Sequence, residues 1–217
     1  MTDKEKARIY REENPQRGNK VLLIGSGKGA IAARDWDLSE WVVCAINNAW
    51  SIVPDFLEYH IRSGDSIPAD GNRPPAGFYG PTRRNISFRD YDSEAQREKY
   101  GGQGVGIGST MFFNAAYWIL GSTDPSLIGF IGCSMSYPNG EANTFYGSGT
   151  ADPLRFSKRY LRDRFATFAS ACKKAGVDTV NFGGEGLMPY ERTSFLLSSL
   201  LMVPPLVADG GGSGLVF

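Results

Sequence analysis

The sequence predicts an α/β domain with a mainly parallel β-sheet and helices on both faces. Short, wholly apolar runs recur along the chain, a pattern typical of strands that are buried on both sides. Several of these runs end in glycine-rich or amide-bearing turns, and helical segments separate them. Because parallel neighbours need a crossover connection, this alternation favours a parallel sheet with right-handed crossovers.

The first two strands frame a glycine turn. Residues 20–24 (KVLLI) form the first predicted strand, the turn covers 25–29, and good helix formers follow at 30–34. Residues 41–46 (WVVCAI) form the second predicted strand. It ends at Asn47-Asn48, residues that suit a tight turn.

A third strand is predicted at 56–61 (FLEYHI), between Pro54 and the charged stretch 62–65. Residues 66–103 are rich in Pro, Gly, Arg, Asp and Tyr and show no sustained period, so we expect a long irregular insertion. Long loops in compact domains are usually functional or disordered. The aromatic residues of this insertion indicate that it packs against the domain.

The second half repeats the alternation of strand and helix. Ser109 or Thr110 is expected to cap its first helix, Pro153 fits the first turn of its second helix, and Gly176 ends that helix. The expected elements are a glycine-rich turn at 104–109, a helix at 110–120, a strand at 126–132, a polar loop at 133–150, a helix at 152–175 and a strand at 178–182.

The 217 residues suit one domain. We expect a charged extension at 1–19, a single α/β domain at 20–194 and a C-terminal tail at 195–217. The first residues lack the apolar stretch of a secretory signal. The apolar run at 195–207 is too short and too broken by serines and prolines to span a membrane.

Composition narrows the choice of partners. Lys plus Arg equals Asp plus Glu at 23 each, so the neutral chain has no electrostatic footprint for duplex nucleic acid. Cys44, Cys133 and Cys172 are widely spaced, and we expect buried thiols in a reducing cytoplasm. With no CxxC pair and His60 as the single histidine, no structural zinc site is expected.

The first candidate site is the turn Gly25, Ser26, Gly27, Lys28 and Gly29. A turn from a strand into a helix presents backbone N–H groups and the positive end of the helix dipole, and glycines let a phosphate approach closely. The text GSGKGA matches neither GxGxxG nor the Walker loop. The alternative is a tight turn without a ligand.

Three further candidate sites are expected at strand ends and helix starts. Asn47 and Asn48 can donate and accept toward a base or sugar, whereas a dinucleotide site usually has Asp or Glu there. Small residues and hydroxyls at Gly108, Ser109 and Thr110 can hold a second phosphate or a sugar hydroxyl. The polar loop that begins at Ser134 and includes Tyr137 is typical of a specificity loop. Plain turn and helix capping remains the alternative for the first two.

The candidate bases are Asp65, at the end of the third strand, and His60, inside it. A lone strand histidine is more often a packed residue than a base. Asp35-Trp-Asp37 and Asp90-Tyr-Asp92 match a DxD pattern, but neither follows an apolar strand directly. No GxSxG elbow occurs, so transfer from an activated phosphate donor is favoured over a serine intermediate.

The runs VLLIGSGKGA, VVCAINNAW and LIGFIGCSMSY, with the GST helix start between the last two, resemble the sialyltransferase-like, Rossmann-like phage and bacterial proteins of the DUF115 type. That group includes 6-hydroxymethylpterin pyrophosphokinase-like proteins. The resemblance covers residues 20–190. Lys28 and Gly29 stand where Pro and Ser are usual, and Ser134 stands where an aspartate is usual. Sialyltransferases of this fold use a histidine outside the main sheet, so that role does not transfer to His60.

The leading hypothesis is a nucleotide-binding, glycosyltransferase-like transferase with a CMP- or UDP-linked sugar donor. The donor phosphate would lie at 25–29, its nucleoside near Asn47-Asn48, and aromatic residues of the insertion over the acceptor. One alternative is an ATP- and magnesium-dependent pyrophosphokinase, which needs Asp65 and Asp152 near Gly27. The other is a non-catalytic nucleotide-binding protein that retains the fold. An NAD-dependent oxidoreductase is disfavoured by the missing acidic residue at the second strand end.

Overall fold

A six-stranded sheet forms the centre of the computed structural model, which describes residues 20–63, 73–88, 110–133, 135, 144–145 and 158–183. The strands are β1 (Lys20–Ile24), β2 (Trp41–Ile46), β3 (Leu57–Ser63), β4 (Arg84–Phe88), β5 (Leu127–Ile131) and β6 (Asp178–Asn181). The helices are the 3-10 helices η1 (Lys28–Asp35) and η2 (Asn47–Ser51) and the α-helices α3 (Met111–Ser122) and α4 (Lys158–Lys174).

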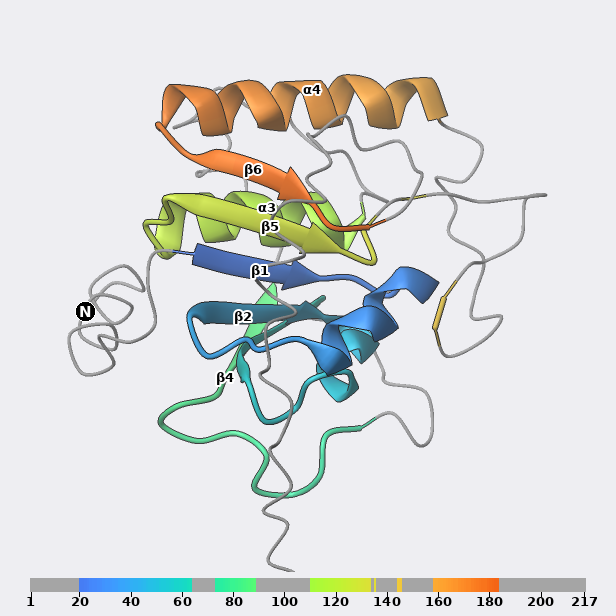
Figure 1. Ribbon diagram of the computed structural model, residues 1–217, viewed down its shortest axis with the longest axis vertical. Helices are drawn as coiled ribbons and strands as arrows, with labels where there is room; N and C mark the ends of the chain where they lie inside the picture. The colour runs from blue at the N-terminus through green and yellow to red at the C-terminus, as the bar shows by residue number, and fades with distance from the viewer. Residues whose placement is uncertain are drawn as a thin grey trace, which may run out of the picture.

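The strand order is β4-β3-β2-β1-β5-β6, and each pair of neighbours is parallel (Figure 1). From β1 the chain first adds β2, β3 and β4 on one side, and later adds β5 and β6 on the other. The direction of winding therefore reverses between β1 and β5. In open parallel sheets, ligands bind at the carboxyl ends of the strands at such a switch point.

Two apolar clusters, one on each face, hold the sheet between its helices. Alternate side chains of β1 and β2 separate onto the two faces, as the pleat of a strand requires: Val21 and Leu23 join one cluster, Leu22 and Ile24 the other. The first cluster contains α3 and α4, and the second contains residues of η1. Figure 1 shows α3 behind the strands and the blue coil of η1 in front of them. The predicted α/β, Rossmann-like architecture is confirmed.

The apolar runs located the strands closely. β1 and β2 have the predicted bounds, β5 and β6 are each shorter than predicted, and β3 runs from Leu57 to Ser63 instead of 56–61. The helix predicted at 110–120 is α3 (Met111–Ser122). α4 begins at Lys158 in the part of the chain that the structure describes, so Asp152 and Pro153 lie outside it.

Three local predictions need correction. The insertion at 66–103 is not wholly irregular, because Arg84–Phe88 forms β4 and pairs with β3. The strand sequence RNISF has two apolar residues, Ile86 and Phe88, among polar ones, which is too weak a pattern to predict it. The crossover after β1 is a 3-10 helix: Ala30 and Ala33, three positions apart, face the core as 3-10 geometry requires. Asn47-Asn48 starts η2 rather than a simple turn.

The three cysteines are buried free thiols, as predicted. Burial raises the pKa of Cys44, Cys133 and Cys172 above the ordinary value for a thiol. These thiols therefore stay protonated and inert near neutral pH. Among the helices of the described ranges, none is long and apolar enough to cross a membrane.

Candidate functional site

The candidate site lies at the carboxyl ends of the strands, where the turns after β1 and β5 pack together and the neighbouring strand β2 also ends. The glycine turn after β1 packs directly on the turn after β5. The Gly25 N–H donates to the Ile131 carbonyl at 2.8 Å, and the Gly27 N–H donates to the Gly132 carbonyl at 2.8 Å. A Cβ atom on Gly25 would lie 2.5 Å from the Gly132 oxygen.

This contact gives Gly25 and Gly27 a structural reason to be glycine. Their N–H groups are engaged by β5 and its turn, so neither is open to a phosphate. Gly132 is constrained from the other side: its φ is +67°, and a Cβ there would meet the Ala30 side chain at 2.5 Å. The two turns are locked together by backbone contact that no larger residue permits.

The open part of the turn is Lys28 and Gly29, at the start of η1. Both residues are exposed, and a Cβ on Gly29 would meet nothing within 4 Å. Within the described ranges, neither backbone N–H has a hydrogen-bond acceptor. First-turn N–H groups of a helix lack internal partners and attract anions. The predicted phosphate site at 25–29 therefore narrows to these two residues and the Lys28 ammonium.

The polar loop after β5 returns to the same turn. Thr144 forms an antiparallel bridge with Gly27, and the Phe145 N–H donates to the Ser26 carbonyl at 3.0 Å. The structure thus brings the predicted specificity loop against the predicted phosphate turn, at the point where the winding of the sheet reverses.

Asn47 occupies the end of the neighbouring strand β2. Its φ is +48°, in the left-handed region that asparagine tolerates better than most residues. Its side-chain Oδ1 is buried and has no hydrogen-bond partner among the residues that the structure describes. A buried acceptor without a partner is costly, so a donor from a ligand would stabilise this arrangement. Asn48 is half-buried beside it, and its carbonyl accepts from the Ser51 hydroxyl.

His60 lies in β3, as predicted, and is buried with only 3% of its surface exposed. Nε2 lies 2.6 Å from the Asn47 carbonyl and Nδ1 lies 2.6 Å from the Tyr79 hydroxyl. Burial lowers the pKa of His60 below its usual 6.5, and the nearby Arg62 charge lowers it further, although the bond to Asn47 opposes the shift. His60 is therefore neutral at pH 7 with both ring nitrogens engaged.

Tyr79 and Arg83 are site residues that the sequence did not single out for chemistry. The Arg83 guanidinium donates to the carbonyls of Leu57, Phe78 and Pro54 and lies 4.2 Å above the Phe78 ring. It therefore fixes Phe78 and Tyr79 against the sheet. The sequence indicated part of this arrangement, because the aromatic residues of the insertion predicted that it packs against the domain, but the sequence did not indicate which residues they contact.

A hollow of about 450 Å³ lies beside β4, and Tyr79 is one of the residues that line it. Its volume falls within the range of small-molecule pockets. Arg84 carries no ion pair to another described residue. The hollow is lined by Tyr59, Tyr79, Gly80, Arg83, Arg84, Asn85, Ile86 and Trp118.

Thr110 is the N-cap residue of α3, in agreement with the prediction, but its hydroxyl makes no capping hydrogen bond. Its Oγ1 is buried without a partner in the described part of the chain. Five predicted site residues lie outside the described residues: Asp65, Gly108, Ser109, Ser134 and Tyr137. Their proposed roles stay predictions.

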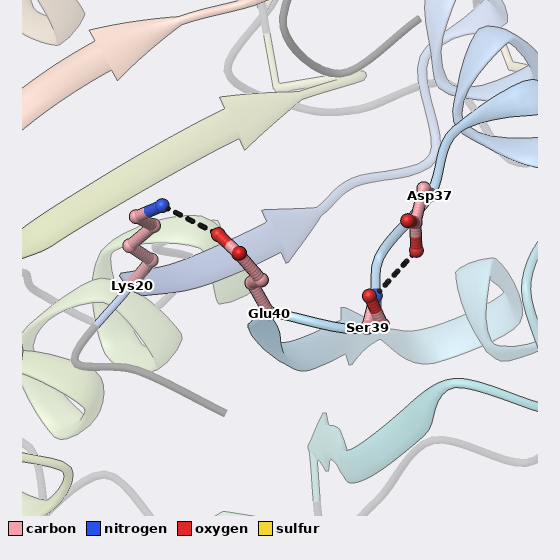
Figure 2. A network of polar contacts seen from close by, with 4 residues as sticks. All are labelled: Lys20, Asp37, Ser39 and Glu40. Carbon is pink, nitrogen blue, oxygen red and sulfur yellow. Dashed lines mark hydrogen bonds and ion pairs between the residues drawn. The ribbon is translucent and has the colours of Figure 1, made fainter. Parts of the chain in front are cut away.

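The amino ends of β1 and β2, at the opposite end of the strands, carry a different set of polar contacts (Figure 2). Lys20 and Glu40 form an exposed ion pair at 2.9 Å, and the Asp37 carboxylate accepts the Ser39 N–H at 3.0 Å. The bonds from Ser39 lower the pKa of Asp37. Asp37 therefore caps the turn that enters β2, so the DxD text at 35–37 has a local structural role at the amino end of that strand.

No group of three or more His, Cys, Asp and Glu side chains that could hold a metal ion occurs within the described ranges. Comparisons with family models, with curated proteins and with solved structures found no match for this chain. The site's geometry is thus the basis for a functional proposal.

Proposed function

We propose that the protein binds a nucleotide at the carboxyl edge of its sheet and acts as a glycosyltransferase-like transferase with a CMP- or UDP-linked sugar donor. One observation carries the proposal: Thr144 and Phe145 of the loop after β5 contact the turn after β1 at the switch point, and no described residue accepts from the Lys28 and Gly29 N–H groups. A phosphate would accept from these donors, with the Lys28 ammonium adding charge.

The nucleoside would lie toward β2, the next strand. Ser26 and Asn47 follow the neighbouring parallel strands β1 and β2, in which Ile24 pairs with Ala45. The Asn47 Oδ1, which has no partner in the part of the chain that the structure describes, would accept from a hydroxyl or amino group of the nucleoside. An amide in place of a carboxylate at this position favours a mononucleotide or nucleotide-sugar over NAD. The sialyltransferase-like resemblance agrees with that preference.

The acceptor would lie in the hollow beside β4, under Tyr79 of the insertion. Transfer needs a base to take the proton of the acceptor hydroxyl. Asp65 is one candidate. His60 is the other, and because both of its ring nitrogens are engaged, it would have to take the proton through the Tyr79 hydroxyl. A turnover assay of Asp65→Asn and Tyr79→Phe would distinguish these routes.

Thermal melting in the presence of CMP, UMP, CDP, UDP or ATP tests the binding proposal. We expect a cytidine or uridine nucleotide at millimolar concentration to raise the melting temperature. Lys28→Ala should weaken binding about tenfold, since it removes one charge-assisted contact. Lys20→Ala, at the amino end of β1, is the matched control and should bind like the native protein. Absence of any shift with all five nucleotides would overturn the proposal.

A panel of nucleotide-sugars distinguishes catalysis from binding alone. Turnover of a CMP- or UDP-sugar supports the transferase. Binding without turnover supports a non-catalytic protein that retains the fold, the alternative that Ser134 in place of aspartate leaves open. An ATP shift that depends on magnesium would instead favour the pyrophosphokinase.

A further inference from the structure

His60 connects the candidate nucleoside position to the insertion. A backbone carbonyl can only accept, so the 2.6 Å contact with the Asn47 oxygen requires a proton on Nε2. In the neutral imidazole, Nδ1 then carries a lone pair and accepts from the Tyr79 hydroxyl. The two contacts together select a single tautomer and a single ring orientation.

The Asn47 backbone needs such a contact. The residue has a φ of +48°, and a non-glycine residue in this region persists when its surroundings hold it there. The His60 bond fixes the Asn47 carbonyl, and with it the direction of the Cα–Cβ bond. The same residue carries the buried Oδ1, which has no partner among the described residues, at the candidate site.

We infer that His60 is the positioning residue for Asn47: its Nε2–H holds the left-handed turn so that Asn47 Oδ1 faces a hydroxyl or amino donor of the ligand. Tyr79 acts one step further away, because its hydroxyl donates to Nδ1 and holds the ring in the orientation that the Asn47 bond needs. The inference rests on the proposed function for the identity of the ligand as a nucleotide. The positioning of Asn47 itself does not depend on any ligand.

Two substitutions separate positioning from packing. In His60→Gln the side-chain amide reaches as far as Nε2 and can still donate to Asn47. In His60→Asn the shorter amide reaches only the Nδ1 position and can contact Tyr79 alone. We expect His60→Gln to retain nucleotide affinity within about twofold and His60→Asn to lose about tenfold, the equivalent of one net hydrogen bond. Equal losses in the two variants would overturn the inference.

Nuclear magnetic resonance gives a readout that needs no nucleotide. His60 is the single histidine of the chain, so its ring nitrogen signals need no assignment. We expect the Nε2–H tautomer in the native protein and also in Tyr79→Phe, because the Asn47 carbonyl requires that proton in both. The Asn47 amide signals should move in His60→Asn and stay in place in His60→Gln. A native Nδ1–H tautomer, or unchanged Asn47 signals in His60→Asn, would contradict the inference.

The two proposals fail separately. If the native protein binds no nucleotide, the proposed function fails, and the tautomer with the Asn47 signals still decides whether His60 positions the turn. If nucleotides bind but His60→Asn binds as tightly as His60→Gln, the positioning role fails and the proposed function stands. Loss of turnover in His60→Gln with binding retained would show that His60 also serves as the base.

Discussion

At the scale of single residues, the contact between Gly25 and Gly132 shows how closely two turns can pack when neither carries a side chain. The nearest neighbour of a hypothetical Cβ on Gly25 is the Gly132 backbone oxygen, which cannot move aside as a flexible side chain would. Gly29, four residues later, meets nothing. One short turn thus contains a glycine that packing requires and a glycine that packing does not require.

These two glycines give a matched pair of substitutions. Gly25→Ala should lower the free energy of unfolding by about 1–3 kcal/mol, because the new methyl group overlaps the Gly132 carbonyl. Gly29→Ala should leave the free energy of unfolding unchanged or raise it by up to about 1 kcal/mol. Gly29 lies in a helix that alanine can adopt, and alanine lowers the conformational entropy of the unfolded chain. Urea unfolding measures both. Equal destabilisation by the two changes would contradict the close approach.

The depressed pKa of His60 makes stability depend on pH. Above its usual pKa of 6.5 the residue is neutral in both states, and its contribution to stability is fully present. As the pH falls below 6.5, the unfolded chain takes up a proton more readily than the folded protein does. The free energy of unfolding should therefore decrease from pH 7 toward pH 5.5, and level off below the folded pKa as far as His60 is concerned.

Urea unfolding at several pH values measures this dependence, and His60→Gln is the control. The variant has no group at this position that titrates between pH 7 and 5.5, so its stability should stay nearly constant there. A native protein whose stability rises as the pH falls would show that the imidazolium is favoured in the fold, against the effect of burial and of Arg62.

At the scale of elements, α4 shows how one face of a helix stabilises the sheet. Leu161, Phe165, Phe168 and Cys172 are fully or almost fully buried, at the three- and four-residue spacing of an amphipathic helix. The Phe168 ring packs on Tyr117 of α3 at 4.9 Å and on Phe130 of β5 at 6.3 Å. This helix therefore ties α3 to the centre of the sheet.

Phe168→Ala should lower the free energy of unfolding by about 3–5 kcal/mol, because it removes a buried ring and leaves a cavity between α3, α4 and β5. Arg162→Ala, on the exposed face of the same helix, should change it by less than about 0.5 kcal/mol. Thermal or urea unfolding compares the two. A loss of less than about 1 kcal/mol in Phe168→Ala would contradict the packing described for α4.

Elements differ in how well the sequence predicts them, and burial explains why. β1 and β2 are buried on both faces, so their apolar runs end where the strands end. β4 lies at an edge of the described sheet and contributes polar residues such as Asn85, so its sequence resembles that of a loop. The type of η1 was also beyond prediction, because small residues in an eight-residue crossover fit either kind of helix.

The sequence predicted where the turns of the candidate site lie, but not which side chains contact one another there. The glycine turn and Asn47 follow apolar strands, and that position alone marks them as carboxyl-edge residues. The Tyr79 contact with His60 joins two segments through side chains, and no local pattern encodes such a pairing. The sequence likewise could not show that Gly25 and Gly27 are needed for packing while Gly29 is not, because Gly132 approaches the turn from a distant part of the chain.

At the scale of the whole molecule, the strand order predicts a gradient of local stability. β1 has a strand partner on both sides and an apolar layer on both faces. β4 and β6 each have one strand partner in the described sheet. In native-state hydrogen exchange, amides of β1, β2 and β5 should exchange only through global unfolding, while those of β4 and β6 exchange faster. Equal protection in all six strands would contradict this gradient.

The pairing of β1 with β5 has a consequence for the protein's synthesis on the ribosome. Leu23 and Cys133, which contact each other across this part of the sheet, lie 110 positions apart. β1 therefore leaves the exit tunnel long before β5 exists, and the edge of β1 that pairs with β5 stays unpaired while about half of the chain is made. An apolar strand edge in that state invites association with other nascent chains. Newly made protein should therefore depend on chaperones until residue 131 has emerged. This dependence should be stronger than the stability of the finished fold would suggest.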